Sequence, residues 1–223
     1  MAKEKKKAGK IKHEEKSQNK ETPAEKEIDS SSKFLIYFFI FLIVVFGGII
    51  ALRYFYNTSP EVQSYSYNGF VFTNVTGLWY VEMEKAGTKI IYNVPLHFGP
   101  LQLQNILINK DVKKFNNYRQ IYITFDPTTE GLNYVTLAAS ELSINLAQTL
   151  DTTPIAACTK NETDACANRP IRDCNSDSPT IFLNPYGSLN ISVYKNCVQL
   201  NGAGIDLIKA TDRLLLTLFG VMD

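Results

Sequence analysis

One uncharged, strongly apolar run, residues 34–52, dominates the hydrophobic pattern of the chain. As an α-helix this run would be ~28 Å long, close to the ~30 Å hydrocarbon core of a bilayer. It is longer than the apolar core of a secretory signal peptide, and no small-residue cleavage site follows it. The pattern therefore predicts a transmembrane helix that stays attached to the protein as a signal anchor.

Beyond the apolar run, short alternating segments and longer segments with a helical period predict one domain over residues 67–223, joined to the span by a linker at 53–66. Strands are expected at 67–73, 78–83, 88–94, 119–125, 153–157, 179–183 and 189–198. Helices are expected at 101–108, 132–150 and 204–219. This order of elements predicts an α+β fold, with the helices packed on one mostly antiparallel sheet.

Charge is distributed unevenly on the two sides of the span. Residues 1–33 hold ten lysines against seven acids, whereas the chain from residue 54 onward holds twelve basic and fifteen acidic residues. The positive-inside rule therefore predicts a cytoplasmic N-terminus and an extracytoplasmic domain in the cell membrane. The tail, residues 1–33, has too few apolar residues to form a core and is expected to be disordered.

The four cysteines all lie in the outer domain, and an even number of cysteines outside the cytoplasm predicts two disulfides. If the strands at 179–183 and 189–198 form an antiparallel hairpin around the turn at 184–187, Cys174 and Cys197 lie opposite each other. This pairing leaves Cys158 bonded to Cys166. The spacings contain no C-x-x-C motif and no short cysteine pair of the kind found in zinc sites, so a redox or metal role is less well supported.

Four N-x-S/T sequons follow the span, at Asn57, Asn74, Asn161 and Asn190. Asn57 is too close to the membrane to be a good acceptor. The sequence predicts a glycoprotein with glycans at Asn74, Asn161 and Asn190.

Candidate catalytic residues are few. His97 is the only histidine of the domain, and Asp126 ends a predicted strand, so an extracytoplasmic hydrolase would use these two residues. A loop histidine with structural hydrogen bonds and an aspartate that stabilises its own turn are the simpler interpretations. Glu130 and Glu141 are conceivable acid–base partners of Asp126, although nothing in the sequence places them beside it.

No metal site or cofactor is expected from the motifs. Asp206 and Asp212 are six residues apart on the last helix and should point to different sides. The chain has no P-loop, dinucleotide fingerprint or EF-hand loop.

The layout of a Lys/Glu-rich tail, one anchor and an outer domain resembles that of a group of archaeal single-pass membrane proteins. The resemblance is carried by Tyr67-Asn68-Gly69-Phe70, Trp79, Pro95-Leu96-His97 and the stretch from Asn196 to Gly202. It implies an extracytoplasmic domain and no activity, and it transfers no functional residues.

These observations favour a single-pass protein whose outer domain is a binding or assembly module, working with a protein partner in the membrane or envelope. Its contact surface would include aromatic residues that are otherwise typical of a core: Tyr65, Tyr67, Phe70, Phe72, Trp79 and Tyr80. Two alternatives remain open. One is the hydrolase that uses Asp126 and His97, and the other is an accessory factor of membrane-protein biogenesis or secretion whose basic tail contacts the ribosome.

Overall fold

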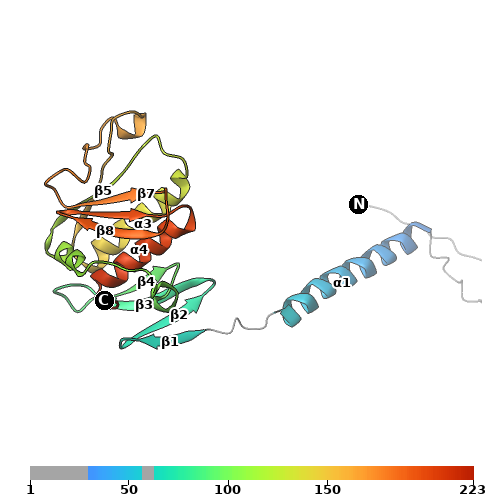
Figure 1. Ribbon diagram of the computed structural model, residues 1–223. Coiled ribbons are helices and arrows are strands. Elements are labelled where there is room, and N and C mark those ends of the chain that lie inside the picture. The colour runs from blue at the N-terminus through green and yellow to red at the C-terminus, as the bar shows by residue number, and fades with distance from the viewer. Residues whose placement is uncertain (1–29, 57–62) are drawn as a thin grey trace, which may run out of the picture. The chain divides into compact units, whose positions relative to one another are not determined.

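The computed structural model describes residues 30–56 and 63–223, which belong to two separate units of the chain. The first unit contains helix α1 (Ser30–Tyr56), drawn in blue in Figure 1. Its segment Lys33–Tyr54 is long and apolar enough to span a membrane, and none of its most apolar stretch is buried in protein. These properties fit a membrane anchor or a signal sequence. The predictions for residues 1–29 and for residues 57–62 of the linker, Asn57 among them, lie outside the described residues.

The second unit begins with a four-stranded antiparallel sheet in the order β1-β2-β3-β4. Its strands are β1 (Ser64–Tyr67), β2 (Phe70–Val75), β3 (Leu78–Glu84) and β4 (Ile91–Leu96). The prediction of a single strand at 67–73 is wrong, because Asn68 and Gly69 have positive φ angles of 49° and 85° and form a turn there. Asn-Gly is a strong hairpin signal, since both residues tolerate the left-handed conformation that a two-residue turn requires.

A second, five-stranded sheet has the order β6-β5-β7-β9-β8, and only the β8–β9 pair is antiparallel. Its strands are β5 (Gln120–Phe125), β6 (Thr153–Ala156), β7 (Thr180–Asn184), β8 (Asn190–Tyr194) and β9 (Cys197–Asn201). The fold is α+β as predicted, but the single, mostly antiparallel sheet is a wrong prediction. The expected strand at 189–198 breaks at Lys195, whose φ of 48° reverses the chain between β8 and β9.

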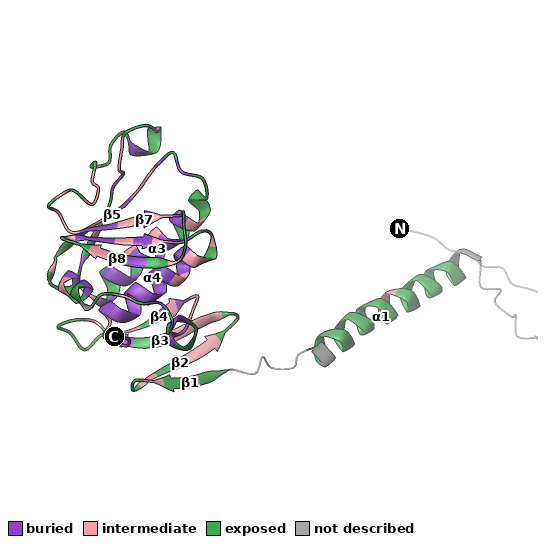
Figure 2. Cartoon of the chain, in the orientation of Figure 1, coloured by how far each residue is buried: buried purple, intermediate pink, exposed green. Residues whose placement is uncertain are grey.

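Helices α3 (Leu132–Thr149) and α4 (Ile205–Leu218) form the layer between the two sheets (Figure 1). Both helices end within one residue of the predicted boundaries. The helix expected at 101–108 is shorter, α2 (Pro100–Leu103), and the 3₁₀ helices η1 (Lys110–Asn117) and η2 (Asp164–Cys166) were not predicted. Helix α4 is buried around nearly its whole circumference, as its purple colour in Figure 2 shows.

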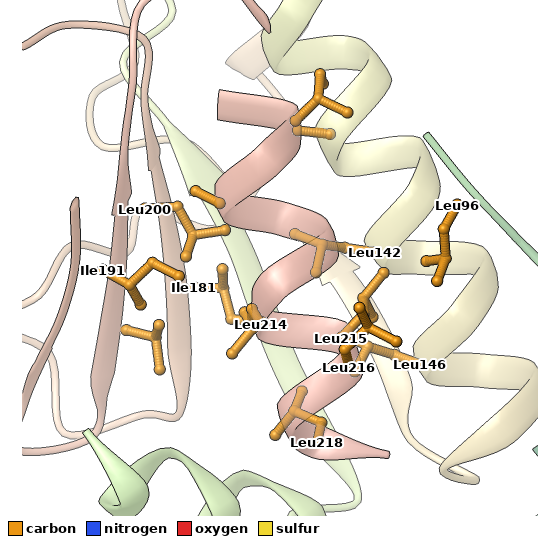
Figure 3. Close-up of a cluster of buried hydrophobic side chains, with 14 of the residues drawn as sticks. Leu96, Leu142, Leu146, Ile181, Ile191, Leu200, Leu214, Leu215, Leu216 and Leu218 are labelled. Carbon is orange, nitrogen blue, oxygen red and sulfur yellow. The ribbon is translucent and has the colours of Figure 1, made fainter. Parts of the chain in front are cut away.

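The core is built around α4 (Figure 3). The leucines of α4 meet residues of α3, of β4 and of the five-stranded sheet: Leu96, Leu142, Leu146, Ile181, Ile191 and Leu200. Each such side chain contributes roughly 1.5–3 kcal/mol when it is fully buried. These contacts therefore hold α3 and α4 in fixed positions relative to both sheets.

The aromatic residues at the start of the domain mostly belong to this core, which is the more typical of the two interpretations of such residues. Phe72 is fully buried, and the Tyr65 ring lies 5.6 Å from that of Phe72 and 4.8 Å from that of Trp79, centroid to centroid. Tyr67 and Phe70 also pack against the core. Aromatic pairs of this kind add about 0.5–1.5 kcal/mol to the burial of their area.

Both predicted disulfides are confirmed. Cys158 bonds to Cys166 and Cys174 to Cys197, with Cα–Cα distances of 6.0 and 5.1 Å. The hairpin that motivated the second pairing does not exist, because β7 pairs with β9 in parallel and Cys174 lies in the loop before β7. The disulfides indicate an oxidising compartment, which fits an extracytoplasmic domain.

Candidate functional site

His97 lies in the short connection between β4 and α2, and close packing fixes the course of this connection. A Cβ atom at Gly99 would overlap the hydroxyl of Tyr65 and would lie 3.3 Å from the ring of Trp79. Only glycine therefore fits without a shift of the aromatic core. Pro100 then starts α2, and His97 is left at the edge of the four-stranded sheet with its side chain one-third exposed.

Glu141 comes from α3 and belongs to a polar stripe on that helix. Glu141, Asn145 and Thr149 recur at every fourth position and are all buried. They lie beside the apolar stripe that contains Leu142 and Leu146, so the buried surface of α3 is half apolar and half polar. Asp212 comes from the middle of α4 and is completely buried.

These three elements bring His97, Glu141 and Asp212 together. Nδ1 of His97 lies 3.1 Å from Oε1 of Glu141, and the backbone N–H of Phe98 donates to Oδ2 of Asp212 at 2.7 Å. One potential ligand atom from each of the three residues lies within 4.8 Å of the other two. The site thus joins residues 44 and 114 positions apart in the sequence.

Two carboxyl oxygens of this site lack a donor. Oε2 of Glu141 and Oδ1 of Asp212 are buried and have no hydrogen-bond partner among the described residues. Burial raises the pKa of Glu141, and the neighbouring Asp212 carboxyl group and the charge of His97 oppose the rise. Burial and the neighbouring charge of Glu141 raise the pKa of Asp212 well above its usual range, against the hydrogen bond from Phe98.

A cavity of about 160 Å³ opens beside the cluster. His97, Glu141 and Asn145 supply its polar wall, and its remaining lining is largely apolar: Leu78, Pro95, Leu137, Ser140 and Ile144. Oδ1 of Asn145 is a third buried oxygen without a partner in the described part of the chain. A cavity of this size holds a few heavy atoms, such as a small ligand or the end of one side chain.

The arrangement supports three kinds of chemistry. The two carboxyl groups are close enough to share a proton, and with His97 they form a donor set for a cation. The half-exposed imidazole could also exchange protons with a molecule in the cavity. All three uses draw on the same buried oxygens.

Asp126, the other predicted candidate, has different neighbours. Its carboxylate accepts hydrogen bonds from the Thr128 N–H at 2.9 Å and the Thr128 hydroxyl at 2.8 Å, and it pairs with Lys160 at 3.3 Å. These contacts are those of a residue that stabilises its own turn. The structure therefore gives His97 the carboxylate partner Glu141, which the sequence left unplaced.

The sequence contains a signal that Glu141 and Asp212 are buried polar residues. Glu141, Asn145 and Thr149 follow a helical repeat next to the apolar stripe, and Asp212 interrupts an apolar helix. Asp206 and Asp212 do point to different sides, since Asp206 is exposed enough to pair with Lys209 at 2.8 Å. The partner of Asp212 comes instead from another helix, which no spacing within α4 could reveal.

Of the predicted glycosylation sites, Asn74 lies near the end of β2, Asn161 lies in a loop, and Asn190 starts the edge strand β8. Asn161 and Asn190 are exposed, and Oδ1 of Asn74 accepts a hydrogen bond from the Gly77 N–H at 3.2 Å. Glycosylation at these three positions stays a prediction.

A larger hollow, of about 800 Å³, lies on the four-stranded sheet and is lined by residues such as Val71, Thr73, Tyr80 and Glu82. None of its lining residues carries a buried polar atom without a partner. The smaller cavity is therefore the better candidate for a specific polar ligand. No family model, curated protein or solved structure matches the chain.

Proposed function

We propose that the protein is a single-pass membrane protein with a cytoplasmic N-terminus, whose extracytoplasmic domain is a binding module with its ligand site at His97, Glu141 and Asp212. The observation that carries the proposal is the pair of buried carboxyl oxygens without donors, one of them on Glu141, which lines a cavity. Buried polar atoms are normally satisfied, and those that are not often mark a place where a ligand completes the bonding.

Topology is tested first. The charge bias across α1 and the two disulfides support an outer domain. An epitope placed after Asp223 should bind antibody on intact cells, whereas one placed before Met1 should bind only after permeabilisation. The opposite result would reverse the orientation, and release of the C-terminal epitope into the medium without the N-terminal one would show that α1 is a cleaved signal.

Ligand binding is tested by photo-crosslinking from the cavity wall. A photoreactive phenylalanine analogue replaces Leu137, which lines the cavity and is 38% exposed. The matched control replaces Ile205, which is 44% exposed and does not line this cavity. Irradiated cells should yield a mass adduct at position 137 that is absent at position 205 and is lost with Glu141→Gln. Equal labelling at both positions, or none, would contradict a ligand site at the cavity.

The alternatives remain testable in the same cells. A hydrolase that uses Asp126 and His97 gains no support from the contacts of Asp126, which are to Thr128 and Lys160. An accessory role in protein biogenesis depends on the basic tail, and deletion of residues 2–20 should then abolish recovery of ribosomes or translocon with the protein.

A further inference from the structure

We propose that His97, Glu141 and Asp212 bind a divalent transition-metal ion of the zinc class, with one open coordination position facing the cavity. This inference rests on the proposed function, because it names the ligand class of the same site. It requires that the donors suit such an ion, that their geometry allows coordination, and that the site needs a cation.

The donor set suits zinc and its neighbours in the first transition row. One imidazole nitrogen and two carboxylate oxygens form a mixed nitrogen–oxygen set, whereas calcium and magnesium prefer oxygen ligands alone. Three protein ligands and a fourth, exchangeable position are typical of zinc sites that act on a bound molecule, as distinct from closed structural sites.

The geometry is close to that of a bound ion. Zinc bonds to nitrogen and oxygen are ~2.0–2.2 Å long, so the ligands of one tetrahedral ion lie ~3.4 Å apart. The three ligand atoms here lie within 4.8 Å of one another. Nδ1 of His97 and Oε1 of Glu141 already lie 3.1 Å apart, and side-chain movements of at most ~1.5 Å would bring all three atoms into coordination range.

The ligands are also held by rigid elements. Glu141 and Asp212 lie on α3 and α4, which pack against each other in the core. The Phe98 N–H holds one oxygen of Asp212 at 2.7 Å and leaves the other, Oδ1, free to coordinate. A ligand whose second oxygen is already hydrogen-bonded has a fixed orientation, as is usual in metal sites.

The need for a cation follows from the buried oxygens. Oε2 of Glu141 and Oδ1 of Asp212 belong to side chains that are at least nine-tenths buried, and they have no donor among the described residues. The nearby basic groups of α4 are engaged elsewhere: Lys209 pairs with Asp206, and Arg213 donates to the Ile106 carbonyl and the Thr217 hydroxyl. Two buried carboxylates without a cation are costly, and a metal ion offsets this cost directly.

The open position would face the cavity that His97 and Glu141 line. Oδ1 of Asn145, on the same wall, could accept a hydrogen bond from a water or ligand atom on the metal. The apolar remainder of the wall, including Leu137 and Ile144, would favour a compact ligand that bears one donor atom.

The competing occupant of the site is a proton shared between the two carboxyl groups. The two occupants are separated with untagged full-length protein in detergent, stripped with a chelator and then given Zn²⁺ or Co²⁺ alone. Metal content after gel filtration gives the stoichiometry, and the visible spectrum of Co²⁺ reports the coordinating nitrogen and oxygen atoms.

We expect one equivalent of metal, a Co²⁺ spectrum that changes with His97→Ala, and at least a tenfold loss of affinity in Glu141→Gln and Asp212→Asn. The control Asp206→Asn removes a carboxylate from the same helix, outside the cluster, and should bind as the wild type does. His13→Ala excludes binding by the only other histidine of the chain. Far-ultraviolet circular dichroism of each variant shows whether it is folded.

Absence of binding, or binding that survives Glu141→Gln and Asp212→Asn, would overturn the proposal in favour of the shared proton. If metal does not bind but the adduct at position 137 forms, the proposed binding module is supported and the proposed metal site is wrong. If metal binds but no adduct forms, the proposed metal site is supported, and the proposed ligand site at the cavity is wrong.

Discussion

Two regions of the outer domain differ in where their polar side chains find hydrogen-bond partners. In the loop at residues 157–179, which carries three of the four disulfide-bonded cysteines, side chains bond to near neighbours. Asp173, for example, accepts hydrogen bonds from the Asn175 N–H at 3.0 Å and the Ser176 hydroxyl at 3.1 Å. In the cluster of His97, Glu141 and Asp212, the partners are 44 and 114 residues apart and two oxygens remain without a donor.

This difference separates a region arranged for stability from one that retains an energetic cost. The loop combines covalent bonds with short-range hydrogen bonds, and its two buried side-chain atoms without a partner among the described residues, Oγ1 of Thr163 and Nε of Arg172, are not carboxyl oxygens. The carboxyl groups of the cluster are buried, and unsatisfied polar atoms are costly in such a place. Sites that keep such a cost are commonly functional, because activity and stability compete for the same residues.

The largest expected effect tests whether packing supports the cluster. Leu142→Ala removes a fully buried side chain next to Glu141 and should lower the free energy of unfolding by about 2–5 kcal/mol. Ile144→Ala, two residues away and 48% exposed, should cost less than about 1 kcal/mol. Denaturant titration followed by the fluorescence of Trp79, the only tryptophan, measures both. Similar losses would mean that α3 is not anchored by its apolar stripe.

The next effect measures the contribution of the covalent bonds. On the chain-entropy model, replacing Cys174 and Cys197 by serine should cost about 3.5 kcal/mol, and replacing Cys158 and Cys166 about 2.5 kcal/mol. The order follows from the sequence separations of 23 and 8 residues, since the longer loop loses more entropy on closure. The midpoint of denaturant unfolding without reductant measures each change. The reverse order would show that strain or residual structure outweighs loop entropy.

The same contrast explains what the sequence could predict. Helices α3 and α4 follow from apolar stripes that are local patterns, and the turn around Asp126 follows from Asp-Pro-Thr-Thr chemistry. The sheet was harder, because β7 pairs with β9 and skips β8. No local pattern in the sequence distinguishes this order from a hairpin of β7 and β8. In the structure the chain reverses at Lys195, so the hairpin forms between β8 and β9.

The disulfide between Cys174 and Cys197 shows how a correct pairing can come from an incorrect geometry. Cys197 starts β9, opposite Thr180 of the parallel strand β7, and the chain before β7 brings Cys174 back to it. The cluster was beyond prediction for a related reason. His97, Glu141 and Asp212 meet only because both helices lie between the two sheets, and sequence spacing carries no information on that arrangement.

A smaller effect tests whether the buried carboxyl groups of the cluster lower the free energy of unfolding. Asp212→Asn keeps an acceptor for the Phe98 N–H and removes one buried carboxyl, so in the presence of chelator it should raise the free energy of unfolding by about 1 kcal/mol. Zinc at a hundred times its dissociation constant for the wild type should stabilise the wild type by about 2.7 kcal/mol and the variant, whose affinity is at least tenfold lower, by no more than about 1.4 kcal/mol. Thermal unfolding with and without zinc measures both. Destabilisation of the variant under chelator would show that the carboxyl is a structural group.

The smallest effect concerns the loop and its response to acid. The hydrogen bond from the Asn175 side chain lowers the pKa of Asp173 below its ordinary value of 3.8; burial opposes this, and further hydrogen bonds from Asn175 and Ser176 add to the lowering. Because the unfolded chain binds this proton more readily, the contribution of Asp173 is present above that ordinary value and is lost as pH falls through the lower, folded-state pKa. Asp173→Asn should therefore cost a fraction of a kcal/mol at pH 7 and flatten the decline in stability at acid pH. Asp177→Asn, an exposed change in the same loop, serves as the matched control in denaturant titrations from pH 7 downward. If the two variants lose stability in parallel with the wild type at every pH, the short-range bonds of Asp173 add nothing to the loop, and the disulfides alone distinguish it from the cluster.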